Sequence, residues 1–440
     1  MNFSAVPHLR RNIGLFIAFR IFFNARFYYP VLAILFLDLG LSLEQYAMLN
    51  VVWAVTIILM EIPSGALADV VGRKTMVLIA AGLMVVEMVV LALAPIGLYL
   101  FPILCLNRVV SGAAEACASG ADEALAYDSL EPSSREEMWP RVLARLMRYS
   151  SAMFIFVMIL GALAYDAVFL NDAAQSVGYA SHLIPSDTVR WPIWMTLVMS
   201  LGAVACAAAM REPPREATAF DLRRVVQNIT QAAVFVFSTR KIFFLLMAGV
   251  LLDSFVRLFL TFGSNYYRLI EIPPFLYGIL GSGSAVLGFL AAIVARRLNT
   301  KAPPVAIFFI LAGLVFIGLV ATGFAVPRWG VLVVVPLGLA MPMAGFFLST
   351  YLNAWTGSEL RATVLSFRGV VMNIGYGMAG LAFAAVTSGL RSADLSAHED
   401  VLFARSLISL PFAFILCMLV LILWYLKTRP RHSTGQRGLI

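Results

Sequence analysis

Long apolar segments dominate this chain and constrain its fold more than any other feature. Hydrophobic residues make up 61% of the 440 positions and charged residues only 13%, a balance typical of membrane proteins rather than soluble domains. A helix needs about 20 apolar residues to cross the hydrocarbon core of a bilayer. The sequence therefore predicts an all-α protein with twelve transmembrane helices. The predicted spans are 13–36, 45–69, 74–95, 98–126, 143–165, 191–210, 242–265, 274–296, 304–325, 329–353, 363–388 and 404–427.

The distribution of Lys and Arg predicts which way these helices cross the membrane. Most cations fall at the termini and in the even-numbered loops, whereas the odd-numbered loops hold only Arg190, Arg268, Arg328, Arg391 and Arg405. Basic loops stay in the cytoplasm, so both termini are expected there, in a plasma membrane such as the bacterial inner membrane. The net charge of +8 then reflects topology and contact with anionic lipids, and no nucleic-acid partner is expected.

The longest cytoplasmic connection, residues 211–241, divides the chain into two halves with six spans each. We expect an N-terminal six-helix bundle over 1–210 and a C-terminal six-helix bundle with a short cytoplasmic tail over 242–440. Within the connection, apolar residues from Phe220 to Phe235 repeat at helical spacing beside a basic edge. This pattern predicts an amphipathic helix at the membrane surface.

A short polar turn between the second and third spans carries the most specific motif. Residues 65–74 read Gly-Ala-Leu-Ala-Asp-Val-Val-Gly-Arg-Lys, with an acid at Asp69 and cations at Arg73 and Lys74. Glycine permits tight turns and close approach of two backbones, which we expect at Gly72 and Gly65 respectively. An acid at a membrane boundary needs a cation or a helix N-terminus to offset its charge.

This turn resembles the motif G-x-L-a-D-r-x-G-r-k between the second and third helices of major facilitator superfamily transporters, with Val70 in place of the usual basic residue. The resemblance implies two pseudo-symmetric six-helix bundles that rock about a central site. It also implies that Asp69 caps the eleventh helix and that Arg73 pairs with Asp128 at the end of the fourth. The matching stretch of the second half lacks the acid, so this latch is expected on one side only.

Ionisable residues inside a span are costly to insert, so each is a candidate for function or half of a structural pair. In the fourth span Arg108, Glu115, Ser119 and Asp122 follow helical spacing and are expected on one face, beside Glu123. Such a face lines a water-filled cavity or a helix interface, and we favour the cavity. The segment from Arg108 also resembles the fourth-helix signature of proton-driven facilitators, which implies a role for Arg108 in proton movement. All four histidines lie outside the spans, so carboxylates are expected to carry the protons.

Polar residues of the first and seventh spans are candidates for the substrate cavity. Arg20 and Asn24 share one side of the first span and Arg26 points elsewhere, so only one arginine is expected to meet the substrate. A weak internal repeat aligns Arg26 with Arg257 and favours Arg26. Asp253 and Arg257 lie one turn apart, which fits a self-neutralised pair as well as a cavity site. Two matched arginines would suit an anion, because guanidinium binds carboxylate or phosphate through paired hydrogen bonds.

The function expected from these patterns is secondary active transport of a small organic solute, preferably an anion or zwitterion, coupled to protons or sodium in a functional monomer. No phosphate-binding loop is found, which argues against ATP-driven pumping, and no enzyme activity, cofactor or metal is expected. Efflux of amphipathic drug-like compounds by proton antiport is the alternative within this class. A lipid translocator or non-transporting sensor is the alternative from another class. Glu61, Glu87 and Arg368 are expected to be charges at helix interfaces.

Overall fold

The computed structural model describes residues 7–213, 222–356 and 358–428, and inside some helices, at Asp69 for example, it describes the backbone alone. This part of the chain folds into helices and loops and contains no β-strand. Twelve of its helical segments are long and apolar enough to cross a membrane, which confirms the predicted number of spans.

The spans of the first half are α1 (Pro7–Asn24) with η1 (Tyr29–Val31) and α2 (Leu32–Asp38), α3 (Leu43–Val71), α4 (Arg73–Leu93), α5 (Leu100–Ala118) with α6 (Ala121–Asp128), α7 (Arg135–Tyr165), and α9 (Pro185–Thr188) with α10 (Trp191–Ala209). The spans of the second half are α12 (Arg240–Thr261), η2 (Pro274–Leu276) with α14 (Tyr277–Lys301), α15 (Pro304–Thr322), η3 (Trp329–Val333) with α16 (Val334–Trp355), α17 (Ser358–Ala393) and α18 (Glu399–Lys427). Three further helices lie in loops: α8 (Ala167–Ser176), α11 (Leu222–Ser238) and α13 (Gly263–Leu269).

The first and fourth spans each consist of separate helical pieces, and the break between the pieces changes the direction in which polar side chains point. In the first span α1 ends at Asn24, and η1 and α2 complete the crossing. In the fourth span α5 ends at Ala118, and Gly120 adopts a positive φ of 75° before α6 begins. Because this left-handed conformation is favourable only for glycine, it interrupts the helix there. The predicted continuous face from Arg108 to Asp122 is therefore wrong, since helical spacing does not carry across the break.

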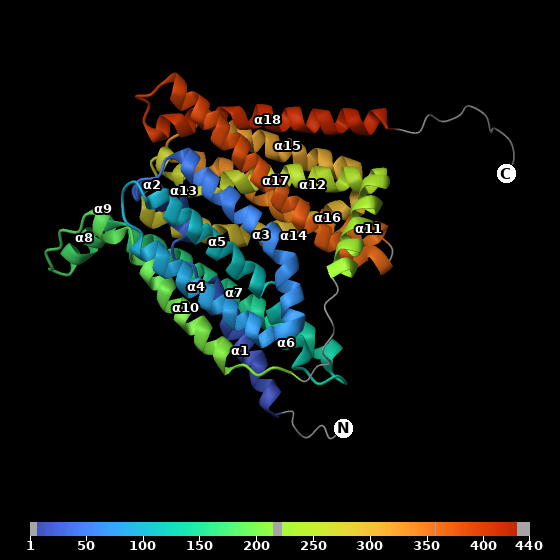
Figure 1. Cartoon of the computed structure of the whole chain (residues 1–440). Coiled ribbons are helices and arrows are strands. Elements are labelled where there is room, and N and C mark those ends of the chain that lie inside the picture. The colour runs from blue at the N-terminus through green and yellow to red at the C-terminus, as the bar shows by residue number, and fades with distance from the viewer. Residues whose placement is uncertain (1–6, 214–221, 357, 429–440) are drawn as a thin grey trace.

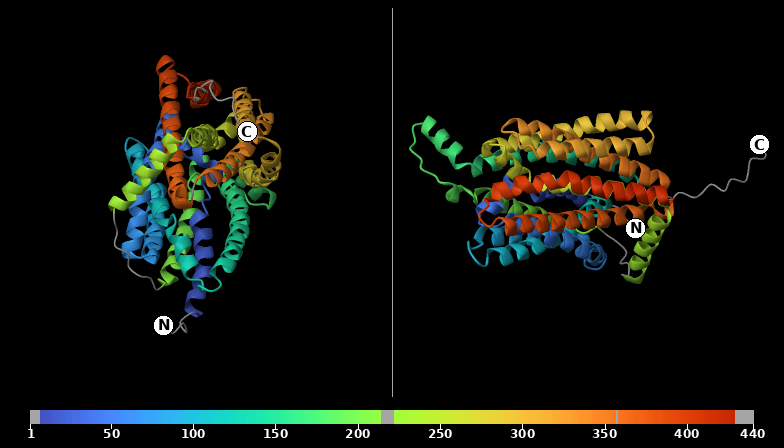
Figure 2. Two further views of the ribbon diagram at one scale, coloured as in Figure 1. Left: turned by 90° about the vertical axis from the view of Figure 1, so that its right-hand side faces the viewer. Right: turned by 90° about the horizontal axis from the view of Figure 1, so that it is seen from above.

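The spans run side by side in two groups, with the first half mostly at the lower left of Figure 1 and the second half mostly at the upper right. Across the boundary, α3 packs against α17 and α7 packs against α14. The odd-numbered loops, with α8, α9 and α13, lie at one end of the molecule, hereafter the odd-loop end. α11 lies at the opposite, even-loop end, at an angle to the spans (Figure 2, right).

The two halves approach each other closely where Gly278 of α14 packs against the backbone of α7. A Cβ atom at Gly278 on α14 would overlap the backbone of α7, only 2.6 Å from the Cα of Ile159. A similar contact inside the first half brings Gly161 on α7 against the backbone of Phe27. Small residues of this kind let membrane helices pack backbone to backbone.

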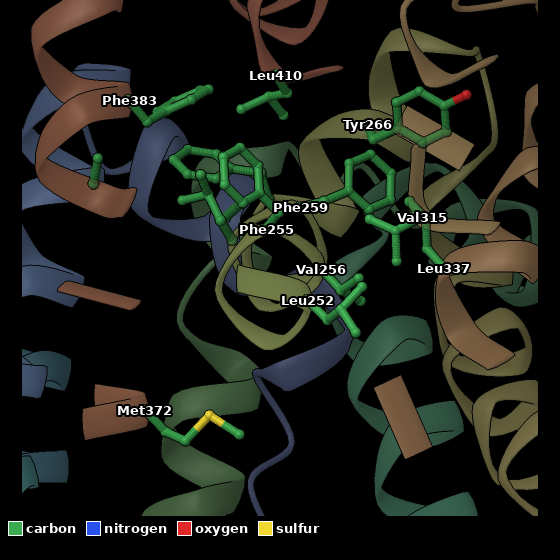
Figure 3. Close-up of a cluster of buried hydrophobic side chains, with 14 of the residues drawn as sticks. Leu252, Phe255, Val256, Phe259, Tyr266, Val315, Leu337, Met372, Phe383 and Leu410 are labelled. Atoms are coloured by element: carbon green, nitrogen blue, oxygen red, sulfur yellow. The ribbon is translucent and has the colours of Figure 1, made fainter. Parts of the chain in front are cut away.

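The core of the second half is built around α12, which is the most deeply buried span. Figure 3 shows Phe255 and Phe259 of α12 among apolar side chains from neighbouring helices, including Tyr266 and Phe383. The ring of Phe259 packs edge-on against that of Tyr266, 5.2 Å between centroids, a geometry that aromatic rings favour. This packing fixes the position of Asp253 on the same helix.

The helix predicted between residues 220 and 235 is present as α11, which packs on α12 and α17. The start of the predicted segment at Phe220 and the side chains of its basic edge, Arg223 and Arg224, lie outside the described residues. Its backbone follows directly into the loop before α12, so it joins the two halves at the even-loop end.

Candidate functional site

A cavity of about 670 Å³ lies between the two halves of the molecule. η1 and α7 of the first half form one wall, and α12, α13, α14, α16 and α17 of the second half form the rest. Most of the lining is apolar or aromatic, and the charged side chains among the lining residues are Asp253 and Arg368. A cavity of this size fits a small organic molecule, for which sites are typically about 300–1,000 Å³.

The two charged residues of the cavity have different partners. Asp253 on α12 lies 2.6 Å from the guanidinium of Arg257, one turn further along the same helix. Arg257 also donates a 3.1 Å hydrogen bond to Asn373 and lies over the ring of Tyr376, 5.3 Å from its centroid. Arg368 on α17 has no carboxylate within 4 Å among the described residues. The pair predicted at Asp253 and Arg257 is thus formed, and its carboxylate also faces the cavity.

Arg26, expected to meet the substrate, is instead buried inside the first half. Its guanidinium lies 2.7 Å from Glu87 on α4, and Arg108 on α5 approaches the other oxygen of the same carboxylate at 3.4 Å. Tyr28 shares the site, because its hydroxyl accepts a hydrogen bond from Arg26. The Asn107 amide donates a 2.6 Å bond to the Glu87 carbonyl and so ties α5 to α4. Glu87, treated as an interface charge, is the centre of this network.

The second arginine of the first span, Arg20, pairs with the acids of α6. Its guanidinium lies 2.6 Å from the fully buried Asp122 and 3.2 Å from Glu123. Asn24 lines a smaller pocket of about 260 Å³ beside α7. The expectation that one of these arginines meets the substrate does not fit this cavity, because neither lines it and both are paired with acids of the first half.

Glu115 differs from the other acids of the fourth span. It lies on α5 before the break, is partly buried, and has no cation within 4 Å among the described residues. Its charge acts on the phenol of Tyr29, which lines the cavity, and on Asp122 toward the even-loop end. Glu115 therefore lies near both Tyr29 of the cavity lining and the buried Asp122.

The turn with the specific motif joins α3 to α4 at Gly72, whose φ of 106° explains the need for glycine. Arg73 forms an ion pair with Asp128 at the end of α6. Glu212 accepts hydrogen bonds from the backbone N–H groups of Arg73 at 3.0 Å and Lys74 at 2.7 Å, where the N-terminus of α4 favours an anion. The sequence did not predict this cap, because Glu212 lies far along the chain from the helix that it caps.

The predictions for Gly65 and Asp69 of the same turn are not confirmed. The expected close approach at Gly65 is wrong for this conformation, because a Cβ there would have no atom within 4 Å. The side chain of Asp69 lies outside the described residues, so its predicted cap on the eleventh helix stays a prediction.

At the odd-loop end, charged side chains connect the two halves. Arg268 of the second half binds both carboxylate oxygens of Asp38 at 2.7 Å, and Tyr165 donates a hydrogen bond to the same acid. Arg391 of the second half lies 2.9 Å from Glu44 of the first. Burial opposes the charge of Arg268, but Asp38 outweighs burial and raises the pKa of Arg268 above its ordinary value. This cation therefore stays charged at any physiological pH.

The cavity residue that sequence reasoning misjudged is Arg368. It was expected at a helix interface, whereas it lines the cavity from α17. Its sequence contained a usable signal, since no acid lies three or four residues away on the same helix to neutralise it. Among the described residues, no group of three or more His, Cys, Asp and Glu side chains is arranged to hold a metal ion.

The family model of the Major Facilitator Superfamily matches residues 14–380. The chain belongs to this superfamily. It is a secondary transporter rather than an enzyme, which confirms the expected class. No curated protein sequence matches this transporter closely enough to be counted as a relative.

Solved structures share the fold of this superfamily member over nearly its whole length. One is a bacterial homologue of the human lysosomal transporter Spinster in an inward-facing, unoccupied conformation, with a TM-score of 0.68, 15% identity, and coverage of 98% of this chain and 100% of that one. The nucleoside transporter NupG has a TM-score of 0.73 and 10% identity over 96% and 100% of the two chains. A D-xylose-proton symporter has a TM-score of 0.61 and 14% identity over 94% and 97%. At these identities the likeness shows the fold alone.

Proposed function

We propose that this transporter moves a small organic solute through the cavity between its halves by proton-coupled alternating access. In this proposal residues 1–210 and 242–440 are the two bundles that rock against each other, and residues 211–241 link them in the cytoplasm. A single chain holds the complete cavity, so the monomer is the functional unit. The even-loop end, which carries most of the Lys and Arg residues, faces the cytoplasm of a cell with this protein in its plasma membrane.

The contacts between the halves support an inward-open state. Among the described residues, every ion pair that joins the two halves lies at the odd-loop end, as between Arg268 and Asp38 and between Arg391 and Glu44. At the even-loop end the pair of Arg73 with Asp128 stays within the first half. Alternating access then requires that the pairs at the odd-loop end break, so that the cavity opens to the other side.

The observation that carries the coupling proposal is the isolation of Glu115. Glu87, Asp122 and Asp253 each have a guanidinium within 2.7 Å, so each is part of an ion pair. Within the described part of the chain Glu115 has no cation within 4 Å, and it lies on α5 near Tyr29 of the cavity lining. A carboxylate in this position can take up a proton when the cavity opens outward and release it toward the cytoplasm.

Reconstitution into liposomes tests this proposal. Vesicles hold a pH-sensitive dye, and labelled sugars, nucleosides and organic carboxylates are offered under an imposed proton gradient or, separately, a sodium gradient. We expect one solute class to accumulate above equilibrium only with the proton gradient. Glu115→Gln should abolish accumulation while exchange of labelled for unlabelled solute continues, because exchange needs no net proton movement.

Two variants locate the coupling site. Glu61→Gln is the matched control, since Glu61 is also a partly buried acid without an ion pair among the described residues but lies on α3 rather than on α5. Asp122→Asn tests the buried acid paired with Arg20. Accumulation that is unchanged in both Glu115→Gln and Asp122→Asn would contradict the coupling role of the fourth span. Accumulation driven by the sodium gradient alone would show that sodium, and not the proton, is the coupling ion.

A further inference from the structure

We infer that the cavity selects an amphipathic organic monoanion, with Arg368 binding its single anionic group and the apolar walls binding its body. This inference rests on the proposed function for the location of the solute and goes beyond it by naming the chemical class. It depends on the charges of the cavity and on which of them are already paired.

The charge available to a ligand in the cavity is that of Arg368. The carboxylate of Asp253 is taken by Arg257, which is itself held by Asn373 and lies over Tyr376. Asp253 acts on Arg368 only through space, since no ion pair joins them. Asp253, Arg257 and Arg368 therefore have a net charge of +1. Of the two guanidinium groups, that of Arg368 lines the cavity and has no carboxylate within 4 Å among the residues that the structure describes.

An unpaired guanidinium inside a membrane protein is costly unless an anion or water compensates it. Its planar donors bind a carboxylate or a similar oxyanion through two parallel hydrogen bonds. A cationic or neutral ligand would leave this charge uncompensated once the ligand had displaced water from the cavity. An anion is therefore the ligand group that restores its hydrogen bonds.

The rest of the cavity fits an apolar body rather than a sugar or a second charge. Phe154 and Met158 line it from the first half, and Leu280, Leu287 and Met341 line it from the second. Met372, one turn from Arg368 on α17 and labelled at the lower left of Figure 3, also lines the cavity and adds to its apolar surface. The polar groups here are few, among them Ser284 and the tyrosines Tyr29, Tyr267 and Tyr277. One anionic group at one end of an aromatic or aliphatic body satisfies this lining.

Binding to the purified full-length transporter tests this inference without any gradient. The probes are indole-3-acetate, 2-naphthylacetate and 4-biphenylacetate, each compared with its own primary amide, which has the same shape and no charge. A charge-assisted hydrogen bond contributes about 1.5–3 kcal/mol, so each acid should bind at least about tenfold more tightly than its amide, as measured by isothermal calorimetry and thermal shift. Equal binding of acids and amides, binding of neither, or tighter binding of 2-naphthylethylamine would overturn the inference.

Variants then assign the selectivity to Arg368. Arg368→Gln should remove the difference between acid and amide, and Arg368→Lys should keep part of it, because a lysine retains the charge but not the paired donors. Arg297→Gln is the matched control, since Arg297 is an exposed cation of α14 at the even-loop end. A selectivity that survives in Arg368→Gln would contradict the assignment.

The two proposals can fail separately. Acids that bind to Arg368 but are never accumulated under a proton gradient would leave the substrate class standing and refute proton coupling. Accumulation of a neutral solute under a proton gradient, with no selectivity for the acids in calorimetry, would support proton coupling and refute the proposed substrate class.

Discussion

Replacing Gly278 by alanine should separate the two halves at the odd-loop end and so favour the opposite conformation. Gly278 on α14 and Met158 on α7 belong to different halves, and the added Cβ would lie 2.7 Å from the carbonyl carbon of Met158. Nonpolar atoms prefer about 3.5–4.0 Å, so the backbones must move apart by about 1 Å. Because the atoms in the way belong to the main chain, a rotamer change cannot relieve the overlap.

The size of the effect follows from the cost of overpacking. Extra methylene groups in a well-packed interface cost about 1–3 kcal/mol, and here that cost applies only to the conformation with the odd-loop end closed. A differential of this size shifts an equilibrium between two conformations by about 5- to 150-fold. We therefore expect a minor outward-open population to become a major one in Gly278→Ala.

Pulsed electron resonance between two spin labels measures this shift. Leu98 and Phe324 are exposed residues of odd-numbered loops in the first and second halves, and each takes a label after the four native cysteines are replaced by alanine. The longer distance should gain population in Gly278→Ala. Gly161→Ala is the matched control, because its clash with Phe27 lies inside the first half and should lower stability without changing the distances. An unchanged distance distribution in Gly278→Ala would refute the reasoning.

Two further variants test the buried network and the closed end. Glu87→Gln should lower the free energy of unfolding of the purified protein by about 3 kcal/mol, because it leaves Arg26 and Arg108 buried without a counter-charge. A melting temperature equal to that of the wild type would show that the network does not stabilise the fold. Arg268→Gln breaks the ion pair with both carboxylate oxygens of Asp38, which is partly exposed and contributes about 1 kcal/mol. It should change the populations of the same spin-label distances several-fold, but less than Gly278→Ala does. A larger change than in Gly278→Ala would show that the ion pair stabilises the closed odd-loop end more than the packing at Gly278 does.

The twelve spans could be predicted from the sequence because a membrane imposes a simple requirement on length and composition. The pairing of Arg73 with Asp128 was implied by the resemblance of the turn to the motif of the superfamily. Charges inside the spans were harder to place. Helical spacing failed for Asp122, because the break at Gly120 separates it from Arg108. The weak internal repeat that favoured Arg26 gave no sign that Arg26 pairs with Glu87 inside the first half.

Pairings between helices explain the remaining differences. Glu87 becomes the centre of a buried network only when α1 and α5 both pack against α4, which no spacing along the chain reveals. The same holds for Glu212, which lies more than a hundred residues from the helix that it caps. Arg368 differs from these cases, because the sequence shows that no acid lies three or four residues away on its helix. This absence indicates that the counter-charge of Arg368 comes from outside the helix.

In the proposed mechanism, protonation of Glu115 determines which end of the transporter is open. The direct test is the spin-label distance between positions 98 and 324, measured in lipid nanodiscs in mildly acidic and mildly alkaline buffer. We expect two distances whose populations change with pH in the wild type, and populations that no longer change with pH in Glu115→Gln. A single distance at every pH in the wild type, or the same pH response in both proteins, would contradict it.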